Sequence, residues 1–150
     1  MMNLPLLVGI AFTLFGVYLV IHAVRNHRRA KQSEDWPVAN GKLVSVELWG
    51  KRNIDGEMKD AEKLSVKYEY ILKGKVYESS TVAFYTMMYP ETIEFAENNS
   101  PDQAVDVYYN PAKPNESVLI PGLRSGNKRY SDLILALFAV FIGIVVAIMS

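Results

Sequence analysis

Apolar residues gather in two long runs, one toward each end of the chain. Neither run, over residues 4–24 and 133–149, contains Asp, Glu, Lys or Arg. At about 1.5 Å per residue, the first run extends roughly 31 Å as a helix, which matches the hydrocarbon thickness of a bilayer. The second run lies at the short end of the range for a crossing. The pattern predicts two transmembrane helices.

Between the two runs the pattern changes to a period of two, which is typical of strands with one buried and one wet face. The clearest alternation covers residues 64–72, where the apolar positions are Leu64, Val66, Tyr68, Tyr70 and Leu72. Lys73-Gly74 then predicts a tight turn, after which residues 76–84 are expected to return as a hairpin partner. Upstream, residues 41–49 predict another strand, which a charged loop over residues 51–61 joins to the first.

Further along, two short strands are predicted over residues 104–109 and 117–120. Pro111 and Pro114 interrupt the chain between them and impose a turn. Residues 90–98 predict one short helix with Pro90 at its first position. We therefore expect a small, mainly antiparallel β barrel or sandwich of about five strands with one short helix, flanked by two transmembrane helices.

The predicted organisation has five parts in chain order. They are a transmembrane helix over residues 4–24, a basic linker over 25–35, a β domain over 36–122, a second basic linker over 123–132 and a transmembrane helix over 133–149. The first run exceeds the usual apolar length of a signal peptide and no basic residue precedes it, so we interpret it as a retained anchor.

Charge follows the same division. Seven Lys or Arg flank the apolar runs, whereas residues 32–123 carry nine Lys or Arg against fifteen Asp or Glu, a net charge of −6. Basic residues beside a span favour the cytoplasmic side, although anionic headgroups alone also attract them. We expect a multi-pass membrane protein, with residues 25–130 in the cytoplasm and both termini outside.

Small residues recur along both apolar runs at spacings that place them on one helix face. They are Gly9, Thr13 and Gly16 in the first run and Ala139, Gly143 and Ala147 in the second. Small side chains let helix backbones approach closely, so we expect a packed hairpin or a dimer. The simpler explanation is that Gly and Ala are common in membrane helices.

The middle of the chain lacks the residues on which many catalytic and metal sites depend. There is no cysteine, and the two histidines, His22 and His27, both precede the β domain. Their positions exclude thiol chemistry, His-assisted serine catalysis and the usual zinc sites from this domain. The acidic residues around 51–61 miss the spacing of an EF-hand, and the negative charge disfavours nucleic-acid binding. We expect no enzyme activity, catalytic residue, cofactor or metal.

One segment is apolar where a connection is normally polar. It lies between a predicted strand and the predicted helix, and its candidate partner-contact residues are Phe84, Tyr85, Met87, Met88 and Tyr89. Exposed methionine and aromatic patches form adaptable contact surfaces. The simpler explanation is that the segment caps the barrel or rests on the bilayer surface.

Three motifs in the middle of the chain resemble a known family. They are Trp36-Pro-Val-Ala-Asn-Gly41, then Tyr68 and Tyr70 with Gly74 and Tyr77, then Val107-Tyr108-Tyr109-Asn110-Pro111 with Pro114 and Ser117-Val-Leu. The region from 36 to 122 is similar to a domain of unknown function found in bacterial membrane proteins, often between membrane helices. The resemblance implies a β fold and a setting in the bacterial inner membrane, and it brings no catalytic residue.

The leading hypothesis is a non-enzymatic integral membrane protein that acts as a membrane-anchored protein-interaction or accessory module. Its expected partners are the lipid bilayer and a membrane or envelope protein, or a second copy of the chain. Two alternatives are a subunit of a membrane transport or channel assembly, and a membrane immunity or inhibitor protein.

Overall fold

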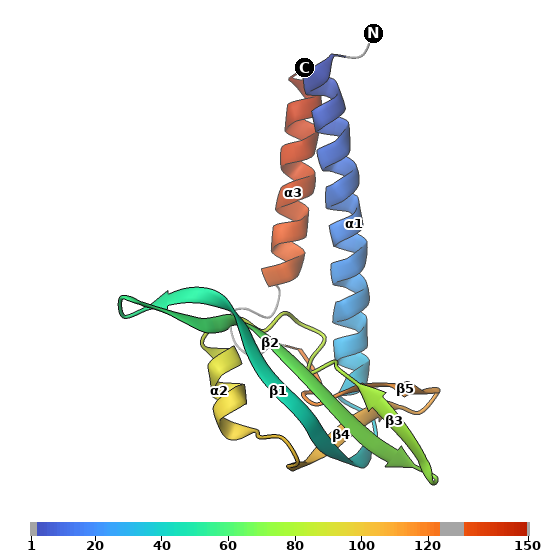
Figure 1. Cartoon of the computed structure of the whole chain (residues 1–150). Coiled ribbons are helices and arrows are strands. Elements are labelled where there is room, and N and C mark those ends of the chain that lie inside the picture. Colours follow the sequence, from blue (N-terminus) through green and yellow to red (C-terminus); the bar gives the residue numbers. More distant parts are fainter. Residues whose placement is uncertain (1–2, 124–130, 150) are drawn as a thin grey trace. The chain divides into compact units, whose positions relative to one another are not determined.

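The computed structural model describes residues 3–123 and 131–149, in which three helices and five strands form (Figure 1). In chain order they are α1 Leu4–Ser33, β1 Val38–Ile54, β2 Glu57–Leu72, β3 Lys75–Ser79, α2 Glu91–Asn98, β4 Ala104–Asn110, β5 Lys113–Val118 and α3 Ser131–Ile148. The chain divides into two compact units. One holds α3 and the part of α1 up to Arg29, and the other is Ala30–Gly122.

The five strands form one antiparallel sheet in the order β3-β2-β1-β4-β5. The predicted five-stranded antiparallel β domain is thereby confirmed. Strand β1 is central because it pairs with β2 from Gly41 to Ile54 and with β4 from Val38 to Lys42. The outer strands β3 and β5 contact each other, so the sheet curls on itself instead of forming a two-sheet sandwich.

Residues 51–61, which the sequence predicts as a charged loop, belong to the β1–β2 hairpin instead. Only Asp55 and Gly56 form the turn, with φ angles of 53° and 88°. Positive φ at both positions is the geometry that Asp-Gly favours in two-residue hairpins. One pair of opposite charges meets directly across the strands, with 3.1 Å between Lys51 Nζ and Asp60 Oδ1, whereas Arg52 lies opposite Lys59.

Other predicted boundaries shift by a few residues. Strand β3 ends at Ser79, not at residue 84, and Pro90 is the N-cap of α2, not its first helical residue. Strand β5 begins at Lys113 and includes Pro114, where a turn was predicted. Because β5 lies at the edge of the sheet, a residue without a backbone N–H is tolerated there.

Among the described residues, α1 is the one helix long and apolar enough to cross a membrane, a property it shares with signal sequences near an N-terminus. It continues to Ser33, beyond the predicted end at residue 24. The apolar part of α3, Leu133–Ile148, is shorter. It extends about 24 Å as a helix against roughly 30 Å of hydrocarbon, so the second predicted span is not confirmed. Most of the predicted linker 123–132 lies outside the described residues.

The core lies on the inner face of the curled sheet and is centred on two tyrosines of β2. The buried cluster consists of Ala39, Leu43, Val66, Tyr68, Tyr70 and Val107. The Tyr68 hydroxyl donates to the Thr81 carbonyl at 2.7 Å and lies 2.9 Å from Ser117 Oγ. The Tyr70 hydroxyl donates to the Pro114 carbonyl at 2.6 Å. The contacts with Ser117 and Pro114 cross the interior from β2 to β5, which is three places away in the sheet.

Replacing Tyr68 with phenylalanine leaves the Thr81 carbonyl and the Ser117 hydroxyl without this buried partner. We expect Tyr68→Phe to lower the free energy of unfolding by about 1–3 kcal/mol, the typical cost of an unsatisfied buried polar group. Urea titration of the full chain in mild detergent, followed by tryptophan fluorescence, measures this change.

Tyr108→Phe is the matched control for this measurement. Tyr108 is half-buried on β4, and its hydroxyl has no hydrogen bond within residues 3–123. Its replacement should change the free energy of unfolding by about 0.5 kcal/mol or less. Equal losses in the two variants would contradict the role assigned to Tyr68.

Burial raises the pKa of both Tyr68 and Tyr70 above the ordinary value of 10.0, although hydrogen bonding to Ser117 partly offsets the effect. Below about pH 10 both hydroxyls are protonated in the folded and unfolded chains alike. At higher pH the unfolded chain releases protons that the folded chain retains, so folding becomes less favourable.

We therefore expect the free energy of unfolding to fall as the pH rises above about 10, and to fall less steeply in Tyr68→Phe. Urea titrations of both proteins at several pH values from about 8 to 11 measure the two slopes. Identical slopes above the ordinary tyrosine pKa would argue against burial of the Tyr68 hydroxyl.

Candidate interaction surface

The segment predicted as a partner-contact surface, residues 83–89, connects β3 to α2 without regular secondary structure. We call it the methionine segment. Its start is fixed by two backbone hydrogen bonds to the Val82 carbonyl, at 3.0 Å from Leu119 N and 2.8 Å from Ile120 N. These bonds hold the chain after β3 beside the chain that follows β5.

Phe84 packs inside the domain. Its half-buried ring meets the Trp36 ring edge-on, with 5.7 Å between the ring centroids and 87° between the planes. Edge-to-face contacts at this distance stabilise an aromatic pair beyond the area they bury. Phe84 therefore holds the methionine segment in place and contributes little to the exposed surface of that segment.

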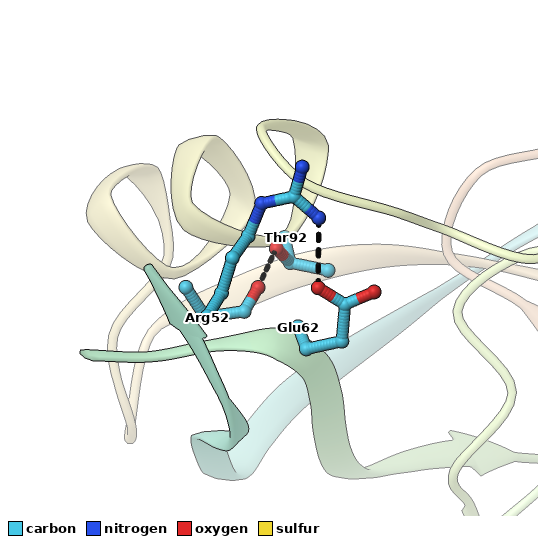
Figure 2. Close-up of polar contacts among 4 residues, drawn as sticks. Arg52, Glu62 and Thr92 are labelled. Atoms are coloured by element: carbon cyan, nitrogen blue, oxygen red, sulfur yellow. Dashed lines mark hydrogen bonds and ion pairs between the residues drawn. The ribbon is translucent and has the colours of Figure 1, made fainter. Parts of the chain in front are cut away.

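Tyr89 fixes the other end of the segment. The Arg52 guanidinium lies over its ring, 4.7 Å from the centroid, and Arg52 Nη1 donates to Glu62 Oε2 at 2.9 Å. Figure 2 shows this ion pair beside Thr92, whose hydroxyl donates to the Ala61 carbonyl at 2.6 Å. Thr92 is fully buried, so its bond attaches the start of α2 to β2.

The Arg52–Glu62 ion pair matters more for where it places the guanidinium than for the free energy that it contributes. Both side chains are about 40% exposed, at 43% and 39%, and ion pairs at such sites contribute roughly 0–1 kcal/mol because water screens them. What the pair does is orient the guanidinium over the Tyr89 ring, where a cation is attracted to the π face.

Between its two fixed ends, the methionine segment borders an open cavity of about 240 Å³. Tyr85 and Met87 line this cavity together with Lys63 and Leu64 of β2. Met88 beside them is 48% exposed. The segment thus combines a fixed frame, a hollow and an exposed flexible side chain, which is chemistry suited to contact with an apolar group.

The predicted helix-packing residues lie within the helical unit, where most of them meet. A Cβ added to Gly9 would lie 2.9 Å from the Ala147 backbone, and one added to Gly143 would lie 2.7 Å from Thr13 N. At Gly16 the equivalent neighbour is Val140 N, at 2.8 Å. Only backbones in close contact leave so little room.

Ala139 is the exception among these residues, since it is half-buried and none of the glycine contacts involves it. Ala136 is buried instead, and Val140 faces Gly16. The facing positions 136, 140, 143 and 147 alternate in steps of four and three, which is a heptad pattern. Searching for that pattern would have found Ala136 in the sequence.

Sequence reasoning also missed Arg52, Glu62 and Thr92. Arg52 lies within the predicted charged loop of residues 51–61 and Glu62 directly follows it, and Thr92 has no distinctive neighbours in the sequence. Within residues 3–123 and 131–149, no three His, Asp or Glu side chains lie close enough together to hold a metal ion.

A comparison with family models matches residues 39–124 to a domain of unknown function, DUF3592. The match covers more than half of the 150 residues and contains β2, β3, α2, β4, β5 and nearly all of β1. No curated protein matches the chain. The expectation of an uncharacterised domain family is confirmed: the chain belongs to the family described as Domain of unknown function (DUF3592).

Proposed function

We propose that this protein is a non-enzymatic, membrane-anchored module that binds another membrane or envelope protein through the methionine segment. The observation that carries the proposal is the exposure of Met88 beside an open cavity, in a segment that Phe84 and Tyr89 hold at both ends. When a partner covers an apolar side chain that is held at a fixed place on the surface, the burial of that side chain stabilises the complex.

Fixing the segment before binding favours association. Ordering a flexible loop on binding opposes affinity, and that cost is smaller when the loop is already held. The cavity beside Tyr85 and Met87 accepts one apolar or aromatic side chain of the partner. Buried side chains of this kind carry most of the binding energy in protein interfaces.

We propose further that α1 anchors the module in the bacterial inner membrane and that α3 crosses beside it. Both helices expose many large apolar side chains, among them Phe12, Phe15, Leu135, Phe138 and Phe141. Such surfaces are stable in lipid, and the close contacts at Gly9, Gly16 and Gly143 suit a membrane hairpin. Local thinning of the bilayer accommodates the shorter α3.

The basic residues that flank both helices support an orientation with residues 25–130 in the cytoplasm and both termini outside. Among residues 3–123 and 131–149, no feature favours the two alternatives, a subunit of a transport or channel assembly and an immunity or inhibitor protein. The partners in this proposal are the lipid bilayer and one protein that contacts residues 83–89.

Met88→Glu tests the protein contact. A photo-crosslinking amino acid at position 88 of the full chain should capture a defined protein in cells. In a separate affinity purification of the full chain, Met88→Glu should reduce the amount of that protein recovered by about tenfold or more. The reason is that the interface must then bury a carboxylate without a partner.

Met58→Glu is the control, because Met58 is 60% exposed but lies in the β1–β2 hairpin outside the methionine segment. Its replacement should leave recovery unchanged, and a crosslinker at position 58 should capture nothing specific. Equal recovery from the two glutamate variants, or no crosslink at position 88, would contradict the proposed contact.

Membrane insertion is tested with the full chain. Alkaline carbonate should leave the protein in the membrane pellet, and its intact mass should include residues 1–24, because an anchor is retained whereas a signal sequence is removed. A reporter enzyme active only in the cytoplasm should work when inserted after Gly122 and be silent after Ser150. Activity at both positions would show that α3 does not cross.

A further inference from the structure

A second open cavity, of about 470 Å³, lies beside the first residues of β3. The methionine segment follows the other end of this strand. Its lining includes Lys73, Lys75, Tyr77, Tyr109, Pro111 and Pro114. We call it the lysine–tyrosine cavity. Its volume falls in the range of roughly 300–1,000 Å³ that is typical of small-molecule sites.

The cavity exists because β3 and β5 approach each other without pairing. No backbone hydrogen bond joins residues 75–79 to residues 113–118. The seam between these strands closes beyond β3, where Leu119 N and Ile120 N donate to the Val82 carbonyl. Toward Pro114, which has no N–H to donate, the seam stays open.

The walls of the cavity are held from the core. The Tyr70 hydroxyl donates to the Pro114 carbonyl at 2.6 Å, which fixes one wall. The Tyr77 ring stacks on the Tyr70 ring, with 5.5 Å between the centroids and 17° between the planes. The cavity therefore presents flat ring faces whose positions are set before any ligand arrives.

Lys75 occupies an unusual place for a cation. In the register of β2 and β3, Lys75 lies opposite Leu72 and Tyr77 lies opposite Tyr70, so both β3 residues belong to the core-facing side of the sheet. The Lys75 ammonium lies 5.0 Å from the centroid of the Tyr77 ring. At the mouth of an otherwise apolar interior, a positive charge favours an anion.

No carboxylate neutralises the two lysines of the cavity. Within residues 3–123, Lys42, Lys51 and Lys59 pair with carboxylates, whereas Lys73 and Lys75 do not. No Asp or Glu lines the cavity. Two uncompensated cations are thus gathered at one point of a region whose net charge is −6.

We propose that the lysine–tyrosine cavity binds a small organic anion with a flat apolar body. The acidic group lies between Lys73 and Lys75, and the body packs on Tyr77, Tyr109 and the two prolines. An inorganic anion would leave the ring faces uncovered, and a neutral aromatic molecule would leave the lysines uncompensated. The site is independent of the methionine segment and of the partner proposed there.

The test uses three probes that share one body and differ in the attached group. They are 2-naphthoate, 2-naphthyl phosphate and the uncharged 2-naphthol. The full chain is placed in lipid nanodiscs and titrated with each probe by calorimetry, with empty nanodiscs as the blank. Both anions should bind, and 2-naphthol should bind about tenfold more weakly or worse, because it lacks the charge-assisted hydrogen bonds.

The comparison between the two anions identifies the source of the acidic group. Tighter binding of the naphthoate assigns a carboxylate ligand, and tighter binding of the naphthyl phosphate assigns a phosphate ester. Equal binding of all three probes, or no binding by either anion, would overturn the proposal.

Variants locate the binding at this cavity. Lys73→Gln combined with Lys75→Gln should raise the Kd of the anions about tenfold and leave 2-naphthol unchanged. Tyr77→Leu should weaken all three probes, by about fivefold, because a stacking face is lost.

Lys59→Gln is the matched control, since Lys59 Nζ pairs with Glu57 at 3.4 Å in the β1–β2 hairpin. It should leave every Kd unchanged. Circular dichroism of each variant reports whether it is folded. Lys73 and Lys75 are both exposed and lie outside the buried core cluster. A folded double lysine variant with wild-type affinity would overturn the proposal.

Discussion

The hydrogen bonds of Tyr68 and Tyr70 across the interior are the constraint on which the β domain depends. Their hydroxyls are buried and must find partners, because an unsatisfied buried polar group is costly. The partners lie on β5 and on the chain after β3, so the sheet satisfies them only by curling. Strands β3 and β5 are thereby brought together without the backbone ladder that would close a barrel.

The incompletely closed seam gives the domain two surfaces of different chemistry. Where the seam closes at Val82, the chain continues into the methionine segment, which offers polarizable apolar side chains. Where it stays open at Pro114, rings and lysine ammonium groups line a cavity. In the proposed function, attachment to a membrane raises the effective concentration of the module near its partner, so a contact of few residues is sufficient.

The β1–β2 hairpin shows how local chemistry and charge compete in a sequence-based prediction. Asp55-Gly56 is a strong signal for a two-residue turn, yet the many charges around it indicated a solvated loop. In the folded hairpin Lys51 lies opposite Asp60, whereas Arg52 lies opposite Lys59, so charges of opposite and of like sign both face each other. The turn signal was the better guide because it acts through backbone conformation, whereas charge alone does not distinguish a strand from a loop.

The sequence by itself determined the strand that alternates over residues 64–72, the long apolar helix α1 and the absence of cysteine and histidine from the β domain. Each of these depends on composition or on the spacing of near neighbours. Only the tertiary structure decided that Arg52 meets Glu62 beside a shift of register near Gly50, and that Lys75 shares a cavity with Pro114. Such contacts depend on bulges and on the curl of the sheet. Their effects on strand position add up over many residues and leave no local pattern in the sequence.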